Sequence, residues 1–325
     1  MESGQVQTST IYQPVQEDLL QVEECLRQVG EVAQPYLAGP LKHILARSGK
    51  RLRPALCLLV GKCYDYNLEV LVPVATGVEL LHTATLVHDD SVDNALVRRG
   101  VPTINSLWGS GVAVLVGDYL FAKAASLVSA VKIPRVMSLF AQTLMAISSG
   151  ELAQNFAAFN VSISRHQYFE RIGQKTASLF ALATEAGAVV SQAPEADIKA
   201  FRDYGYSLGL AFQIIDDILD YTGQETELGK PTGNDLSQGT ITLPAIIFGE
   251  SHPQPNPVTA FVEHRDDQAY LERAVAAVCH PAIIEKCYAI AGSFCSQACA
   301  ALPPIPAPVR HSLVELCHLV LKRQK

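Results

Sequence analysis

Apolar residues recur at helical spacing along almost the whole chain, and the long alternating patterns that predict strands are absent. Leu and Ala, both strong helix formers, dominate these segments, and Gly or Pro separates one segment from the next. The longest periodic segments cover residues 68–92, 134–159, 165–192 and 195–222. We therefore expect an all-α fold, a single large helical bundle whose central helices are buried on several sides.

The chain is long enough for one large domain or two modest ones, with 325 residues. Because 49% of the residues are apolar and only 18% are charged, it can bury a large core. No change in composition marks a domain boundary. We expect residues 1–13 to form a disordered tail and residues 14–325 to form one all-helical domain.

The composition also excludes several classes of protein. A formal net charge of −7 argues against a nucleic-acid binder. The N-terminus does not resemble a signal peptide, and no uninterrupted apolar run reaches the length of a membrane span. The eight cysteines form no CxxC pair, which favours free thiols in a reducing compartment. We therefore expect a cytoplasmic protein without a transmembrane segment.

Two aspartate clusters interrupt apolar segments, in "HDDSVD" at 88–93 and "IDDILD" at 215–220. Both have the pattern Asp-Asp-x-x-Asp, which places the first and last carboxylates on one helix face. Like charges at this spacing repel, and the C-terminal end of a helix also disfavours anions. A bound cation would remove both conflicts, and ligands that are all oxygen suit Mg²⁺. The candidate metal ligands are Asp89, Asp90, Asp93, Asp216, Asp217 and Asp220.

A single such cluster is more often surface charge or a helix cap. Two copies in matching apolar contexts reverse that judgement. If both helices end at one rim, six carboxylates would face a shared cavity. Basic residues in Gly-containing stretches suggest that the partner of the metal is a diphosphate, because Arg and Lys bind phosphate oxygens. These stretches are "SGKRLRP" at 48–54, "RRG" at 98–100, "GQKTASLF" at 173–180 and the segment around Lys230.

Together these motifs resemble the trans-isoprenyl diphosphate synthases, or polyprenyl synthetases, from about residue 40 to the C-terminus. The likeness rests on "GKRLRP", "LHTATLVHDDSVDNALVRRGVPT", "GQKTASLF", "FQIIDDILDY" and "GKPTGNDL", which occur in the order of that family. The resemblance implies an all-helical homodimer with a central active-site cavity between the two aspartate-bearing helices. It also implies three Mg²⁺ ions per active site.

The resemblance implies a role for each matching residue. The isopentenyl diphosphate site would comprise Gly49, Lys50, Arg53, His82 and Arg99. The allylic diphosphate site would comprise Arg98, Lys175, Thr176, Gln213 and Lys230. Among these, Lys175, Thr176 and Gln213 are the candidate catalytic residues. Asp89, Asp93 and Asp216 would bind Mg²⁺ directly, with the other three aspartates in or near the coordination shell.

The implied reaction needs no protein nucleophile. Mg²⁺ and basic side chains would stabilise the departing diphosphate of the allylic substrate. The double bond of isopentenyl diphosphate would then attack the allylic cation, and a proton would be lost. An apolar wall below the metals must exclude water from the cation.

The length of that wall bears on the product. Val78, Leu81 and Thr85 lie toward the face of Asp89 on the predicted helix. The resemblance to the family implies that Ala84 also belongs to this wall. Short-chain relatives tend to carry bulky aromatic residues near positions 84 and 85. The small residues here resemble long-chain, octaprenyl- or solanesyl-type synthases, so we expect a product longer than twenty carbons, which would partition into membranes.

Other interpretations remain open at this stage. A geranylgeranyl or farnesyl diphosphate synthase would share every motif but stop earlier. A class I terpene cyclase usually has a different second motif, and a head-to-head condensing enzyme would lack the "RRG" and "GKP" pattern. A regulatory subunit of a two-chain prenyl synthase tends to lose the aspartates. A plain helical scaffold would leave the basic residues unexplained.

Overall fold

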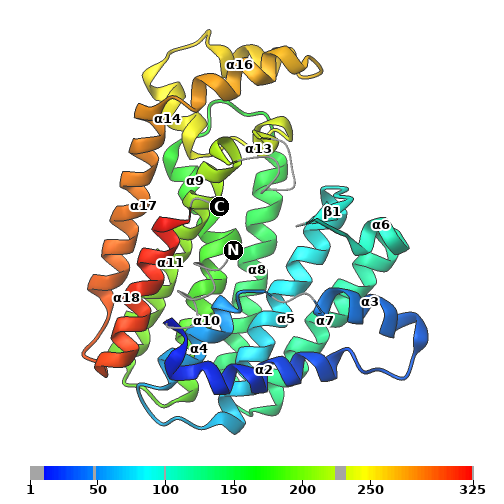
Figure 1. Ribbon diagram of the computed structural model, residues 1–325, viewed down its shortest axis with the longest axis vertical. Coiled ribbons are helices and arrows are strands. Elements are labelled where there is room, and N and C mark those ends of the chain that lie inside the picture. Colours follow the sequence, from blue (N-terminus) through cyan, green and yellow to red (C-terminus); the bar gives the residue numbers. More distant parts are fainter. Residues whose placement is uncertain (1–10, 47–48, 99, 224–231, 324–325) are drawn as a thin grey trace. The chain divides into compact units, whose positions relative to one another are not determined.

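The computed structural model describes residues 11–46, 49–98, 100–223 and 232–323. Most of these residues lie in helices, and two short strands among them pair into a small sheet (Figure 1). The predicted all-α fold is confirmed. The chain divides into two compact units. Unit 1 comprises Met1–Gln142, Leu179–Gly205 and Ala301–Leu316, and unit 2 comprises Thr143–Ser178, Tyr206–Ala300 and Cys317–Lys325.

The elements are distributed as follows. Those of unit 1 alone are η1 (Gln13–Val15), α2 (Gln16–Val29), α3 (Pro35–Leu45), α4 (Leu52–Gly61), α5 (Leu68–Val92), β1 (Val97–Arg98), β2 (Val101–Pro102), α6 (Ile104–Trp108) and α7 (Ser110–Ala130). Those of unit 2 alone are α9 (Arg165–Ile172), η2 (Gly173–Ala177), α13 (Asn234–Ser237), α14 (Leu243–Ser251), α15 (Pro257–Glu263) and α16 (Gln268–Val278). Those with residues in both units are α8 (Pro134–Phe156), α10 (Ser178–Val190), α11 (Glu195–Thr222), α17 (Pro281–Ala301) and α18 (Ala307–Lys322).

Helix α5 is the buried centre of unit 1. It packs along α7 and against α4 and α2 (Figure 1). Asn67 caps its N-terminus by accepting a hydrogen bond from the backbone N–H of Glu69 at 3.0 Å. Gly77 permits the close approach of α7, because a Cβ there would lie 2.8 Å from Val128. This packing fixes the helix that ends in the first aspartate motif.

A hairpin formed by β1 and β2 follows α5. Strands β1 and β2 pair antiparallel, with Val97 opposite Pro102 and Arg98 opposite Val101. Gly100 in the turn has a φ of 75°, a conformation that disfavours side chains with a Cβ. The hairpin thus returns the chain to α6 immediately after the motif.

Unit 2 contains a departure from the predicted continuous helix over 165–192. Helix α9 starts at a capping box of Ser164 and Gln167, and a π-helical turn, η2, then separates it from α10. Gly173 opens this turn, where a Cβ would lie 2.2 Å from the Tyr206 hydroxyl. Periodicity missed the turn because one inserted π turn changes the hydrogen bonding without breaking the helical pattern.

The domain predictions need one correction. Ile11 and Tyr12 are buried and Gln13 begins η1, so ordered structure starts before the expected residue 14. Residues 1–10 lie outside the described part of the chain. The assignment of residues 14–325 to one domain stays a prediction, and the chain divides into two compact units. Their boundaries fall within helices, where no change in composition signals them.

Three described helices, α5, α7 and α8, are long and apolar enough to cross a membrane by length and composition. In α5, 72% of the apolar window is buried inside the protein, compared with 33% in α7 and 28% in α8. Packing therefore accounts for the hydropathy of α5 but leaves apolar surface on the other two helices. The absence of a transmembrane segment stays a prediction. All eight cysteines lie in the described residues, and none of them forms a disulfide bond.

Candidate active site

The three carboxylates of the first aspartate motif differ in solvent exposure. Asp90 is only 2% exposed, whereas Asp89 is intermediate and Asp93 is exposed at the end of α5. The Arg98 guanidinium donates from Nε to Oδ1 of Asp90 at 2.5 Å. The buried carboxylate thus has an internal cation, and Asp89 and Asp93 are the more accessible pair of this motif.

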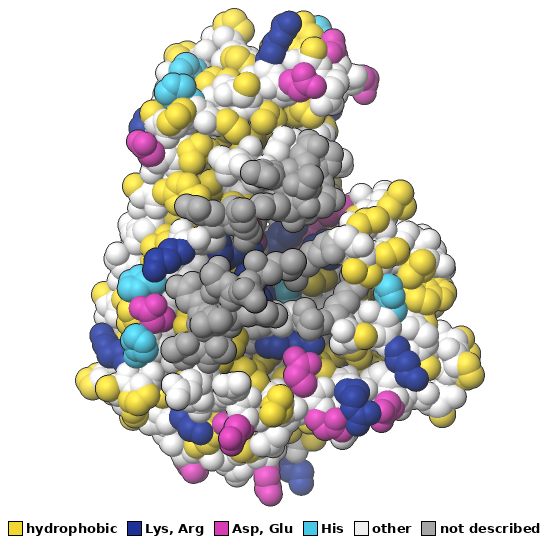
Figure 2. Space-filling model, in the orientation of Figure 1, with side chains coloured by type: hydrophobic (Ala, Val, Ile, Leu, Met, Phe, Trp, Pro, Cys, Tyr) yellow, Lys and Arg dark blue, Asp and Glu magenta, His cyan; other side chains and the backbone are white. Residues whose placement is uncertain are grey.

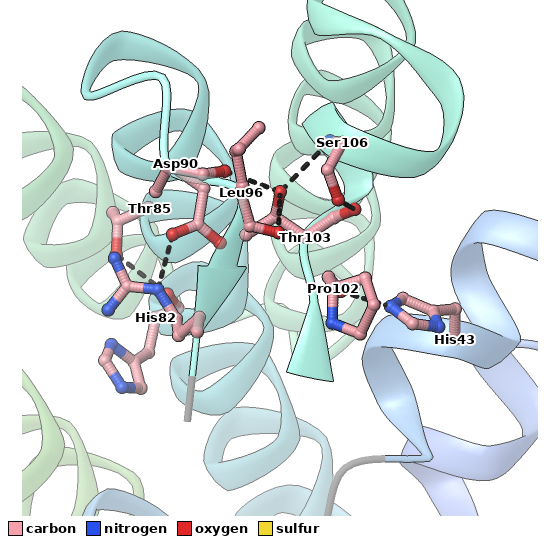
Figure 3. A network of polar contacts seen from close by, with 10 residues as sticks. His43, His82, Thr85, Asp90, Leu96, Pro102, Thr103 and Ser106 are labelled. Atoms are coloured by element: carbon pink, nitrogen blue, oxygen red, sulfur yellow. Dashed lines mark hydrogen bonds and ion pairs between the residues drawn. The ribbon is translucent and has the colours of Figure 1, made fainter. Parts of the chain in front are cut away.

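A polar network fixes the hairpin that carries Arg98 (Figure 3). Thr103 is fully buried, and its hydroxyl donates to the Ala95 carbonyl at 2.7 Å and accepts from the Ser106 backbone N–H at 3.1 Å. From α3, His43 Nε2 donates to the Pro102 carbonyl at 2.8 Å. These bonds hold both ends of the hairpin, so Arg98 is positioned by residues on either side of it in the sequence.

The "GKRLRP" stretch is shaped by Arg51. This residue has a φ of 46° and precedes α4. Its guanidinium pairs with Glu79 of α5 at 2.9 Å and with Glu23 of α2 at 2.5 Å. Gly49 and Lys50 stay exposed on one side of Arg51. Arg53 on the other side is buried with its guanidinium carbon 4.5 Å from the Phe180 ring centroid.

Two expected substrate residues, Arg99 and Lys230, lie outside the described residues. His82 is partly exposed on α5, and its carbonyl accepts a hydrogen bond from the Thr85 hydroxyl at 2.7 Å (Figure 3). The structure therefore places His82, Arg98, Asp89 and Asp90 at the C-terminal half of one helix and its following hairpin.

In the second motif, on α11, neutral donors hold the middle carboxylate. Asp217 is 2% exposed and accepts from the Tyr168 hydroxyl and from Gln213 Nε2, both at 2.7 Å. Gln213 in turn accepts from the Thr176 hydroxyl at 2.6 Å. The structure thus joins two predicted catalytic residues, Thr176 and Gln213, to a predicted metal-binding carboxylate in one hydrogen-bonded chain.

Burial governs the ionisation of Asp217. Desolvation, reinforced by the charge of Asp235, raises the pKa of the Asp217 carboxyl to about 7, against the hydrogen bonds from Gln213 and Tyr168. The third carboxylate, Asp220, is also 2% exposed, and its Oδ2 accepts from the backbone N–H of Asp235 at 3.0 Å. Asp235 is therefore a further residue of this site.

Lys175 and Thr176 lie in the π-helical turn η2. The Lys175 ammonium lies 2.5 Å from Glu151 Oε2 and 3.4 Å from Gln154 Oε1, both on α8. Gly150 lets α8 approach, because a Cβ there would lie 2.9 Å from the Lys175 backbone nitrogen. A π turn in a helix often marks a functional site, and this one presents two predicted catalytic residues.

Asp216 is the accessible carboxylate of the second motif, with its side chain 36% exposed. Arg323, just past the end of α18, places Nη1 at 2.9 Å from Asp216 Oδ1. Sequence reasoning missed this contact because the two residues are far apart in the chain.

The donor chemistry of both motifs fits Mg²⁺. Each offers only carboxylate oxygens, and each keeps at least one carboxylate accessible beside buried ones that already have fixed partners. Within the described residues, no three His, Cys, Asp or Glu side chains converge on one point. Mg²⁺ does not require such a cluster, because it commonly takes one or two carboxylates and completes its shell with water and phosphate. A cavity shared by the two motifs stays a prediction.

The predicted chain-length wall is well packed. Val78, Leu81 and Ala84 are buried within unit 1, and Thr85 is partly exposed. Ala84 is fully buried although the helical wheel places it to the side of Asp89.

Further residues that sequence reasoning did not assign contact predicted site residues. They include Glu151, Gln154, Tyr168, Asp235 and Arg323. Glu151 and Gln154 carried a usable signal, as polar residues three apart in the mostly apolar segment 134–159, and Asp235 lies in the "GKPTGNDL" stretch. Tyr168 and Arg323 come from distant segments.

Comparison with known proteins gives a consistent result. The family model described as polyprenyl synthetase matches residues 34–278. The chain is 36% identical over 296 residues to a protein of Geobacillus stearothermophilus named heptaprenyl diphosphate synthase component 2, covering 91% of this chain and 92% of that protein.

Solved structures are similar over almost the whole chain. A decaprenyl diphosphate synthase from Rhodobacter capsulatus superposes with a TM-score of 0.91 at 36% identity, covering 98% of this chain and 99% of the other. A polyprenyl synthase from Caulobacter crescentus, complexed with calcium and isoprenyl diphosphate, gives a TM-score of 0.92 at 32% identity and covers 98% of each chain.

Proposed function

Because this chain belongs to the polyprenyl synthetase family and is a prenyltransferase, we propose that it adds isopentenyl diphosphate units to an allylic diphosphate with Mg²⁺ as cofactor. The proposed product is longer than twenty carbons. The synthases of seven- and ten-unit chains among its relatives support this length. A geranylgeranyl or farnesyl diphosphate synthase is the alternative within the same chemistry. A cytoplasmic location is part of the proposal.

One observation carries the metal assignment. In each motif a buried carboxylate is held by a fixed protein partner, Asp90 by Arg98 and Asp217 by Tyr168, while a neighbouring carboxylate stays accessible. Asp89, Asp93 and Asp216 would then hold Mg²⁺, with three ions per active site. Mg²⁺ supplies neutralising charge for the diphosphate oxygens when bound. The calcium in the Caulobacter relative supports a divalent ion.

The protein groups perform the remaining tasks. Lys50, Arg53, His82, Arg99 and the Gly49 backbone would bind isopentenyl diphosphate. Arg98, Lys175 and Lys230 would bind the allylic diphosphate and stabilise its negative charge as the C–O bond breaks. The electron pair of that bond leaves with the diphosphate, and the isopentenyl double bond forms the new C–C bond. A proton is then lost to the departed diphosphate.

Thr176 and Gln213 would contribute oriented dipoles near the cationic carbon. Their hydrogen-bonded chain through Asp217 to Tyr168 fixes both rotamers, so the dipoles need no reorganisation during the reaction. The apolar residues Val78, Leu81 and Ala84 would exclude water from the growing chain.

A second copy of the chain is the proposed partner, giving a homodimer. Unit 1 leaves large hydrophobic side chains exposed on α6 and α7, and Figure 2 shows such side chains gathered over α6. The exposed residues include Leu107, Trp108, Val114 and Leu115. Monomeric proteins rarely leave large contiguous apolar patches exposed. The name of the Geobacillus relative, a component, favours one competing candidate in which this chain needs a different partner chain.

Incorporation of radiolabelled isopentenyl units by the purified chain alone tests the proposal. We expect incorporation with farnesyl diphosphate and Mg²⁺, and its loss in EDTA. Asp89→Asn and Asp216→Asn should each abolish most incorporation, whereas Asp266→Asn, at an exposed aspartate outside the motifs, should not. If the chain alone incorporates nothing with any primer, but diphosphates still raise its melting temperature, the two-component candidate is favoured instead.

A further inference from the structure

Arg323 forms an ion pair with Asp216, the accessible carboxylate of the second aspartate motif. Its Nη1 lies 2.9 Å from Asp216 Oδ1, and its guanidinium carbon lies 4.5 Å from the centroid of the Phe212 ring. Phe212 and Asp216 are one turn apart on α11, so the arginine covers the helix face on which Asp216 lies. All three residues belong to unit 2.

This arrangement resembles a cation site already filled by the protein. The Arg323 side chain is only 21% exposed, so its charge is largely withdrawn from water. A guanidinium in that position offsets the negative charge of Asp216, as a metal ion would.

Not all polar atoms of the Arg323 guanidinium are hydrogen-bonded within the described residues, however. Both Nε and Nη1 are buried, yet within the described residues neither makes a hydrogen bond of good geometry. Nη1 therefore contributes an ion pair without an aligned hydrogen bond. Buried guanidinium N–H groups in this condition cost free energy, which weakens the contact relative to a bidentate pair.

The backbone around Arg323 also permits its release. The residue follows Lys322, the last residue of α18, and its N–H donates to the Val320 carbonyl at 3.3 Å. Swinging the side chain away would require no unwinding of the helix before it. Helix ends open at low free-energy cost, so the position suits a group that leaves.

From these contacts we propose that Arg323 is a resident counter-ion of Asp216 that a divalent metal must displace. The arginine holds the second motif in a low-charge state before the metal binds, and metal binding frees the C-terminal end. Arg323 is thus a residue that tunes metal affinity. The inference rests on the proposed function only in taking Asp216 as a metal ligand.

Metal binding without substrate provides the first test. Mn²⁺ would be titrated into the full chain, and free Mn²⁺ would be followed by its electron paramagnetic resonance signal. Arg323→Gln should raise the affinity of the second motif about three- to tenfold, the range for loss of a partly exposed ion pair with ring stacking. Lys322→Gln removes the same charge one residue earlier, at an exposed position, and should leave the affinity unchanged.

Several outcomes would overturn the inference. Equal effects of Arg323→Gln and Lys322→Gln would mean that only the general charge of the C-terminal end matters. A loss of affinity in Arg323→Gln would mean that the arginine assists metal binding. Asp216→Asn separates the two proposals. If it leaves Mn²⁺ binding unchanged, the metal role of Asp216 fails and this inference fails with it. If it weakens binding while Arg323→Gln has no effect, only the counter-ion role fails.

Tryptic release of the last two residues, followed by intact mass, gives a second readout that requires no enzyme activity. Cleavage after Arg323 should be slow in metal-free protein and several-fold faster with saturating Mn²⁺. The Asp216→Asn variant should be cleaved rapidly without metal. A cleavage rate that Mn²⁺ does not change would contradict displacement.

Discussion

Arg98 and Asp90 form an ion pair across the turn that follows α5, with Nε of the arginine 2.5 Å from Oδ1 of the aspartate. The aspartate is 2% exposed, whereas about a third of the arginine side chain is exposed. The middle carboxylate of the first motif is therefore neutralised by the protein itself, even before any metal binds.

Removing that cation should destabilise the metal-free protein. Arg98→Gln removes the ion pair between Nε and the buried Asp90 carboxylate, and we expect a loss of about 3 kcal/mol in the free energy of unfolding. Urea unfolding in EDTA would measure it. Arg165→Gln breaks an exposed ion pair with Glu250 and should cost less than about 1 kcal/mol. Equal losses in the two variants would show that the Asp90 pair has no special role.

Asp217 should make metal-free stability fall with rising pH. Burial raises the pKa of its carboxyl from 3.8 to about 7, so between these values the folded protein holds a proton that the unfolded chain has lost. The stabilising contribution is complete below pH 3.8 and is lost as the pH rises to about 7, by up to about 1.4 kcal/mol per pH unit.

Asp217→Asn checks this sign. Its stability relative to wild type should be greater at pH 8 than at pH 4.5, as measured by urea unfolding in EDTA. Asp203→Asn, at a half-exposed aspartate of the same helix, should show little change between the two pH values. A relative gain for Asp217→Asn at the lower pH would contradict the pKa shift.

Filling the wall should shorten the product. Ala84→Phe introduces an aromatic ring into the predicted wall of the hydrocarbon channel, and we expect the product distribution to shift to fewer isoprene units. Ala274→Phe is the matched control, because Ala274 is also fully buried but lies on α16 of unit 2, which carries none of the predicted wall residues. Both changes overpack the core, but only the first should change product length. An unchanged product from Ala84→Phe would remove Ala84 from the wall.

Glu151 should act on the allylic substrate through Lys175. Glu151→Gln keeps the size of the side chain but loses the ion pair that orders the lysine in its π turn. We expect KM for the allylic diphosphate to rise about fivefold, while KM for isopentenyl diphosphate stays within twofold. Glu170→Gln, at an exposed glutamate of the neighbouring helix α9, should change neither constant. Equal increases in both KM values would indicate a general structural role for Glu151.

The sequence predicted the regular parts of the fold well. The expected helices over 68–92 and 195–222 coincide with α5 and α11, because long 3.6-residue periodicity with a clear cap or break is a strong signal. The π turn at Gly173 and the Val97–Pro102 hairpin were missed, since each depends on how a short segment packs against a distant one.

In the candidate site, too, local sequence signals were predictive and packing between distant segments was not. Motif spelling located the aspartates and basic residues, and spacing placed Asp89 with Asp93 on one face. Spacing could not tell that Asp90 and Asp217 would be buried and held by Arg98 and Tyr168, because burial is set by neighbouring helices. Arg323 is the clearest case, as nothing near "LKRQK" indicates that it contacts Asp216.

Product analysis tests the central claim most directly. The purified chain would receive Mg²⁺, farnesyl diphosphate and excess isopentenyl diphosphate, and the products would be resolved by mass spectrometry. We predict a ladder of successive isopentenyl additions that ends above twenty carbons. A largest product of twenty carbons or fewer, or loss of farnesyl diphosphate without any isopentenyl addition, would contradict a long-chain prenyl diphosphate synthase.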